Sequence, residues 1–254
     1  MSLHDTFRSV VLNEGIKTLG DRRGRESIGV FSCLQIRSIT IPSTLEMIGD
    51  KTFYACKKLR RVKFREGCAL REIGEAAFHS CRSLRNVRLL ESIEHLGERC
   101  FSESGVEVVT IPSSFTALDP YAFYSCYRLK KVVFRDGSKL RKICDNCFEY
   151  SGLDEFIAPP GLKEIHCGAF YGCKKLKRVV LNEGLEAISG GIIFGVFESS
   201  GIEEITLPST LKQIDLRTFI NCDSLQTIYV KSGCEADLSH IHRPESTQII
   251  YLPD

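Results

Sequence analysis

Residues 45–64 read LEMIGDKTFYACKKLRRVKF, and this stretch sets the pattern for the whole chain. Relative to Phe53, apolar residues lie at −8, −5, +9 and +11, Gly at −4, Cys at +3 and Leu at +6. The segment after Leu59 alternates apolar and polar residues, which is typical of a short strand with one buried face. The segment around Phe53 predicts a short helical or 3₁₀ return that closes one coil of the chain.

The same spacing recurs along the sequence at intervals of 22 to 27 residues. The anchoring residues are Phe31, Phe53, Phe78, Phe101, Phe123, Phe148, Phe170, Phe197 and Phe219. A longer form of the repeat carries Cys at +3, whereas a shorter form has a Ser-Gly turn, as at Ser151 and Gly152. Because one coil cannot bury its apolar face alone, we expect the coils to stack into a solenoid with a continuous core.

The repeats extend over about residues 7–230 of the 254 residues, so the chain is predicted to be one elongated domain. Insertions are expected at 21–27 and 190–193, and residues 231–254 are expected to form a C-terminal cap with a last strand at 247–253. The predicted fold is an α/β solenoid, a right-handed superhelix. One parallel β-sheet would line its concave face, and short helical or 3₁₀ turns would line the other face.

The composition is that of a globular protein, with 43% hydrophobic residues, 26% charged residues and a formal net charge of +2. This balance argues against nucleic-acid binding through overall charge, although it permits a local basic face. No apolar run of about 18 residues occurs, so we predict no membrane-spanning helix. The N-terminal residues lack the apolar core of a signal peptide, which suggests an intracellular chain or one whose signal has been removed.

The 12 cysteines raise the alternatives of disulfides, a metal site or a packing role. Five of them share the +3 column, and a column repeated in each coil favours a small buried side chain. Cys144 and Cys147 form a lone Cys-x-x-Cys, but Cys147 and Cys100 replace the Ala found there in other repeats. We find no metal-ligand spacing, phosphate loop or nucleophile motif, and we predict no metal, no cofactor and no catalytic residues.

The strand residues that flank the buried positions are expected to face the concave surface, and they include a basic cluster beside an apolar stripe. The candidate partner-binding residues are Arg61, Lys63, Arg65, Arg88, Val108, Lys131, Val133, Arg135, Ile157, Arg178 and Val180. Two interpretations stay open: a solvated sheet face rich in β-forming residues, or an apolar surface rimmed by charge that binds a partner.

The repeated pattern Ile-Gly-x-x-x-Phe-x-x-Cys-x-x-Leu-x-x-Val, together with Thr-Ile-Pro-Ser, resembles BspA-like leucine-rich repeats over about residues 7–230. The resemblance implies a non-catalytic adhesion or protein-interaction module of a surface or secreted protein. It also implies a protein or sulfated-glycan ligand, including extracellular matrix, bound on the concave sheet. The alternatives are a cytosolic scaffold, which fits the missing signal, and a structural spacer that stacks through its terminal strands. The oligomeric state stays open.

Overall fold

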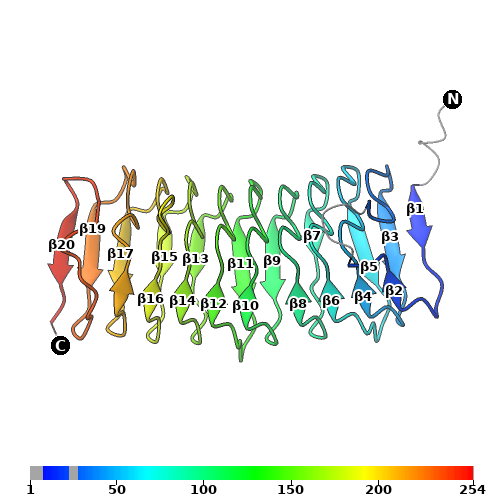
Figure 1. Ribbon diagram of the computed structural model, residues 1–254, viewed down its shortest axis with the longest axis horizontal. Coiled ribbons are helices and arrows are strands. Elements are labelled where there is room, and N and C mark those ends of the chain that lie inside the picture. The colour runs from blue at the N-terminus through cyan, green and yellow to red at the C-terminus, as the bar shows by residue number, and fades with distance from the viewer. Residues whose placement is uncertain (1–7, 23–27, 254) are drawn as a thin grey trace.

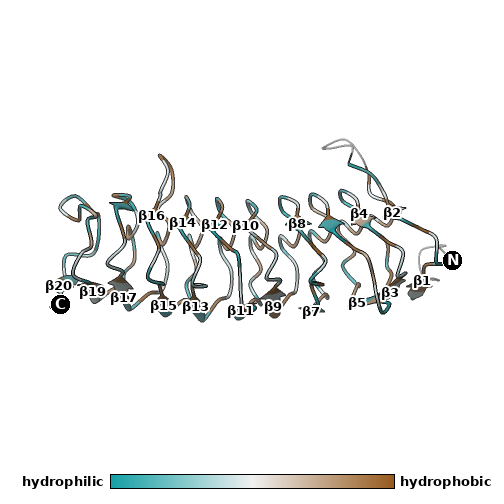
Figure 2. Ribbon diagram, turned by 90° about the horizontal axis from the view of Figure 1, so that it is seen from below, coloured by the Kyte–Doolittle hydropathy of each residue, from teal (hydrophilic) through white to brown (hydrophobic). Residues whose placement is uncertain are grey.

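The computed structural model describes residues 8–22 and 28–253, which form a rod of short parallel strands with β1 at one end and β20 at the other (Figure 1). Each repeat supplies one coil with a long strand on one side and, in most coils, a two-residue strand on the opposite side (Figure 2). The predicted parallel-strand solenoid is therefore confirmed.

The long strands form one row. Their bounds are β1 Ser9–Val11, β3 Ser38–Ile41, β5 Arg61–Phe64, β7 Asn86–Val87, β9 Val108–Ile111, β11 Lys131–Phe134, β13 Glu155–Ile157, β15 Arg178–Val180, β17 Glu204–Leu207, β19 Thr227–Val230 and β20 Gln248–Tyr251. Neighbouring coils pair in register, so that Ile39 lies beside Val62, and Val109 beside Val132. We call this row the long-strand face.

The opposite side carries a second row of strands where helical turns were predicted. Their bounds are β2 Thr18–Leu19, β4 Met47–Ile48, β6 Glu72–Ile73, β8 His95–Leu96, β10 Ala117–Leu118, β12 Lys142–Ile143, β14 Glu164–Ile165, β16 Ala187–Ile188 and β18 Gln213–Ile214. No helix forms in the described residues, so the prediction of helical or 3₁₀ turns was wrong. It follows that none of the described residues forms a helix able to cross a membrane.

The return segment is a series of tight turns in place of a helix because the residue two after each Phe of the column adopts positive φ, as does the residue two before it in six of the nine coils. Lys51 and Ala55, which flank Phe53, have φ of 52° and 55°. The amides of Lys51, Phe53 and Ala55 donate to carbonyls of the next coil at 2.8 Å, whereas a helix would direct them to residues four positions back. Left-handed residues at regular intervals break the continuous right-handed conformation that a helix requires.

The long-strand face is divided into three hydrogen-bonded sheets, where one was predicted. The sheets are β1-β3-β5, β7-β9-β11 and β13-β15-β17-β19-β20. Both breaks follow a strand that ends in Phe, namely Phe64 and Phe134. The buried residue that ends other long strands in the same column is Ile, Leu or Val. Both coils also have a longer loop before their short strand, whereas β19, which ends in Val230, stays paired with β20. The breaks thus accompany the larger side chain.

The core is built on a column of stacked Phe rings. Eight consecutive pairs from Phe31 to Phe219 have ring centroids 5.1 to 6.1 Å apart and planes within 16° of parallel. The column confirms the repeat deduced from the Phe spacing. Leu and Ile columns from the two rows of strands pack around it and make the core continuous along the rod.

The cysteines are all free thiols, and those of the +3 column are buried. Each column thiol donates to the carbonyl oxygen of the Phe in the preceding coil, with S···O distances of 2.9 to 3.1 Å. Burial raises the pKa of Cys126 and Cys173 to about 12. Cys100 and Cys147 are likewise buried beside the Phe column. The thiols of the +3 column are therefore small core groups with a satisfied donor.

The ends and insertions agree with the expected organisation where they are described. The insertion at 190–193 projects beside β16, with Ile192 98% exposed (Figure 2). The strand expected at 247–253 is β20, which extends the row beside β19. Phe7 and residues 23–27 of the other insertion lie outside the described residues. The right-handed superhelix, the concave curvature and the cap at 231–254 stay predictions.

Candidate partner-binding face

The candidate residues lie on the long-strand face because side chains alternate along each strand. On β5, Arg61 and Lys63 point outward, while Val62 and Phe64 point toward the core. Arg88 follows β7 and is exposed. No acidic side chain of the described residues lies within ion-pair distance of Arg61, Lys63 or Arg88, so these cations face solvent with unbalanced charge.

The remaining predicted cations are engaged in ion pairs. Arg65 lies 2.5 Å from Glu14, and Arg135 lies 2.5 Å from Glu91. These partners come from two coils earlier in the chain, and a repeat pattern read one coil at a time does not reveal them.

Lys131 and Arg178 share a single acid that lies between them. Glu155 on β13 is 3.9 Å from the Lys131 ammonium and 3.1 Å from the Arg178 guanidinium. The predicted cations on β11 and β15 are therefore partly neutralised. The net positive charge is concentrated near β5 and β7.

Three acidic residues form clamps that each join three successive coils. Each accepts hydrogen bonds from the amide and hydroxyl of a Ser in the next coil and pairs with a cation one coil further on. The clamps are Glu14–Ser43–Arg65, Glu91–Ser113–Arg135 and Glu183–Ser209–Lys231. Hydrogen bonds from Ser43 and Arg65 lower the pKa of Glu14 to about 2, and those from Lys231 and Ser209 lower the pKa of Glu183.

Because of these clamps, we expect the folded protein to lose stability in acid. A carboxylate whose pKa is lowered in the folded state stabilises the fold above its ordinary pKa of about 4.3, and this contribution disappears as pH falls toward about 2. We expect Glu14→Gln to reduce the pH dependence of urea unfolding between these limits. Glu66→Gln is the control, because Glu66 lies in an exposed loop and forms no ion pair with another described residue. Equal pH slopes for wild type and Glu14→Gln would contradict the clamp.

The predicted apolar stripe is exposed at three of its four positions. Val108 is 43% exposed, Ile157 45% and Val180 37%, whereas Val133 is half-buried. β-branched side chains stabilise strands, but a sheet that faces only water does not require a row of them. Exposed apolar residues beside cations match the composition of a protein interface.

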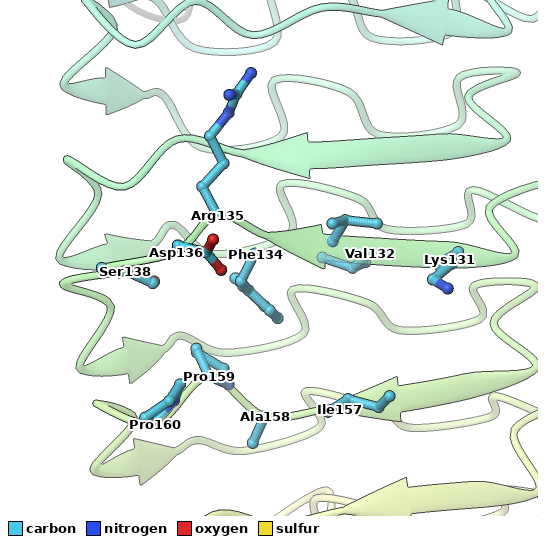
Figure 3. A pocket seen from close by; sticks show the side chains of 12 residues that line it. Lys131, Val132, Phe134, Arg135, Asp136, Ser138, Ile157, Ala158, Pro159 and Pro160 are labelled. Carbon is cyan, nitrogen blue, oxygen red and sulfur yellow. The ribbon is translucent and has the colours of Figure 1, made fainter.

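A groove opens at the break between β11 and β13, with a volume of about 430 Å³ (Figure 3). Val133 and Phe134 line one wall, and Ile157, Ala158 and Pro159 line the other. The Phe134 ring lies edge-on to Phe156, with centroids 6.0 Å apart. Arg135 points away from β13, consistent with its pairing to Glu91 (Figure 3). We call this the apolar groove.

A second groove, of about 680 Å³, opens at the break between β5 and β7. Six cations and no acid line it: Arg60, Arg61, Lys63, Arg82, Arg85 and Arg128. Arg82 pairs with Glu103 at 3.2 Å, and Arg85 and Arg128 share Glu107 at 3.5 and 4.0 Å. We call this the basic groove. Arg60, Arg82, Arg85 and Arg128 were not among the predicted site residues, because they precede the strands in each coil.

The sequence analysis also did not predict an aromatic ridge, which lies in the return segments. Tyr121, Tyr124, Tyr150 and Tyr171 contact one another in sequence order with centroids 5.3 to 6.3 Å apart. Arg99 lies over the Tyr121 ring at 4.1 Å. The sequence could have indicated this ridge, since the four Tyr residues lie within two residues of the column Phe in successive repeats.

The described residues contain no group of three or more His, Cys, Asp and Glu side chains placed to hold a metal ion. Cys144, the first residue of the Cys-x-x-Cys, is half-buried and free.

Comparisons with known proteins agree with the repeat pattern. A family profile described as BspA type leucine rich repeat region, in 6 copies, matches residues 27–150 and 141–241. A search of curated protein sequences finds no match.

Three solved structures share the fold. The chain is similar to a leucine-rich repeat protein from Bacteroides ovatus, with a TM-score of 0.71 and 18% identity over 96% of this chain and 70% of that one. It is similar to the pneumococcal vaccine antigen PcpA, with a TM-score of 0.56 and 19% identity over 97% and 74% of the chains. It is also similar to a leucine-rich repeat protein from Eubacterium ventriosum, with a TM-score of 0.52 and 18% identity over 96% and 81%.

Proposed function

Because the chain belongs to the BspA-type leucine-rich repeat family, we propose that it is a non-catalytic module that binds a protein partner on its long-strand face. One observation carries the proposal: three exposed apolar side chains, one each on β9, β13 and β15, share this face with cations on β5 and after β7 that lack an acidic partner in the described residues. Leucine-rich repeat domains typically mediate protein interactions, and the family is generally non-enzymatic.

The division of labour on this face follows from its charges. Arg61, Lys63 and Arg88 attract an acidic partner and speed its association, with a strength that falls as salt is added. Val108, Ile157 and Val180 supply apolar area that a bound partner removes from water. A sulfated glycan would use the cations alone, so the apolar stripe favours a protein ligand.

Family membership favours a cell-surface or secreted protein that contacts extracellular matrix. A cytosolic scaffold is the second candidate, and the free thiols favour it because disulfides are rare in reducing compartments. Both candidates place the partner on the long-strand face.

The test is a binding screen against purified extracellular-matrix proteins and heparin, with a salt titration. We expect the triple variant Arg61→Glu, Lys63→Glu and Arg88→Glu to lose partner binding while its melting temperature stays near that of wild type, since all three side chains are exposed.

The control carries the same change of net charge elsewhere: Lys142→Glu on the short-strand side, with Lys174→Glu and Lys175→Glu at an exposed corner. It should bind like wild type. If a partner binds the triple variant as tightly as the control, the face is wrongly assigned.

A further inference from the structure

We propose that the basic groove and the apolar groove together bind one extended acidic peptide segment that carries an apolar side chain a few residues from its acidic block. This inference rests on the proposed function and specifies the chemistry of the partner. Both grooves lie at a break between hydrogen-bonded sheets, and both open on the long-strand face.

The basic groove selects negative charge. Its lining holds six cations and no acid, while only Glu103 and Glu107 lie within ion-pair distance of the Arg residues among them in the described part of the chain. Arg60, Arg61 and Lys63 are left to attract carboxylates. Arg guanidinium groups bind carboxylates through paired hydrogen bonds, which suits Asp and Glu side chains of a peptide.

The apolar groove selects a side chain without charge. Val133, Phe134, Ile157 and Pro159 form its walls, and the charged groups beside it are directed elsewhere, Lys131 toward Glu155 and Arg135 toward Glu91. A Leu, Ile or Phe side chain would fill this groove, and its burial would add affinity. A sulfated glycan offers no such group.

The separation of the grooves sets the spacing in the ligand. β7, β9 and β11 lie between the two breaks, so the breaks are three strand spacings of about 4.8 Å, or roughly 14 Å, apart along the rod. The basic groove lies at the strand starts and the apolar groove toward the strand ends, so this is the minimum separation of the two grooves. An extended peptide advances about 3.3 Å per residue and covers this distance with about four or five residues. A much longer flexible spacer would weaken the coupling between the two contacts.

The experiment uses fluorescent peptides and the full chain. The probes contain a block of Glu residues, a Gly-Ser spacer of about two, five or twelve residues and a terminal Leu, in both orders, beside peptides that lack the Leu. We expect the middle spacer to bind roughly tenfold or more tightly than the peptide without Leu. Heparin is the competing probe.

Two variants separate the contacts. Ile157→Asp should remove the gain from Leu and leave the affinity of the Glu-only peptide, whereas Ile193→Asp, at an exposed loop position, should keep the gain. Arg61→Glu with Lys63→Glu should weaken every peptide, whereas Lys174→Glu with Lys175→Glu should weaken none.

The inference is overturned if Leu adds no affinity at any spacer length. Heparin binding together with that result would indicate a site for anions alone. If Leu adds no affinity but a protein partner still requires Arg61, Lys63 and Arg88 for binding, the peptide inference fails and the proposed function is retained. If the variant Arg61→Glu with Lys63→Glu binds the peptides as tightly as its control, the basic groove is part neither of the peptide site nor of the proposed partner-binding face.

Discussion

Replacing Phe148 by Ala is expected to lower the free energy of unfolding by about 3–5 kcal/mol, because it removes a fully buried ring from the middle of the core column. Phe148 stacks on Phe123 at 5.5 Å and on Phe170 at 5.4 Å, and it meets Phe156 at 6.3 Å. The smaller side chain leaves a cavity that the hydrogen-bonded coils on either side cannot close.

The loss should also change the cooperativity of unfolding. In a solenoid the core contacts of each coil are with its neighbours, so a weak interface in the middle divides the rod into two parts. We expect denaturant unfolding followed by circular dichroism to become broader, and hydrogen exchange to accelerate on both sides of the altered coil.

Phe31→Ala is the matched control, since Phe31 is half-buried and, among the described residues, stacks on Phe53 alone. It should cost clearly less than Phe148→Ala. Equal losses for the two variants would show that the Phe column does not hold the coils together in the way its geometry indicates.

The repeat pattern predicted the columns because they depend on local spacing. Residues equivalent to Phe53, Cys56 and Val62 recur at fixed offsets in the repeats, and each offset determines whether a side chain faces the core. The solenoid, the long strands and the packing role of the Cys column follow from these offsets and are present in the structure.

The return segments were misinterpreted because their sequence lacks the usual sign of left-handed turns. Lys51, Ala55 and Ser80 adopt positive φ although none is Gly. The hydrogen bonds from their own and neighbouring amides to the next coil hold them there, and that stabilisation belongs to the stack as a whole. Local propensity therefore pointed to a helical turn that the stacked coils exclude.

The candidate site was predicted only in outline for the same reason. The strand alternation placed Arg65 and Arg135 outward, but Glu14 and Glu91 neutralise them from two coils away. The ladder breaks beside both grooves concern the pairing of neighbouring coils, which the single repeat does not specify.

Gly152→Ala is expected to lower the free energy of unfolding by about 2–3 kcal/mol, although it adds a single methyl group. A Cβ at this position would lie 2.2 Å from the carbonyl oxygen of Tyr127 in the preceding coil. The close approach serves the hydrogen bond from the Gly152 amide to the Cys126 carbonyl, at 3.1 Å.

The coil that contains Gly152 cannot move aside, because Phe148 and Tyr150 donate backbone hydrogen bonds to the following coil. Gly137→Ala is the control: Gly137 has a φ of +71° but open space around its Cβ position, so only backbone strain of about 1 kcal/mol is expected there. Gly105→Ala should reproduce the larger loss, since its Cβ would lie 2.2 Å from the Arg82 carbonyl oxygen. If Gly152→Ala and Gly137→Ala unfold at the same urea concentration, contact between coils is not what requires the Ser-Gly turn of the shorter repeat.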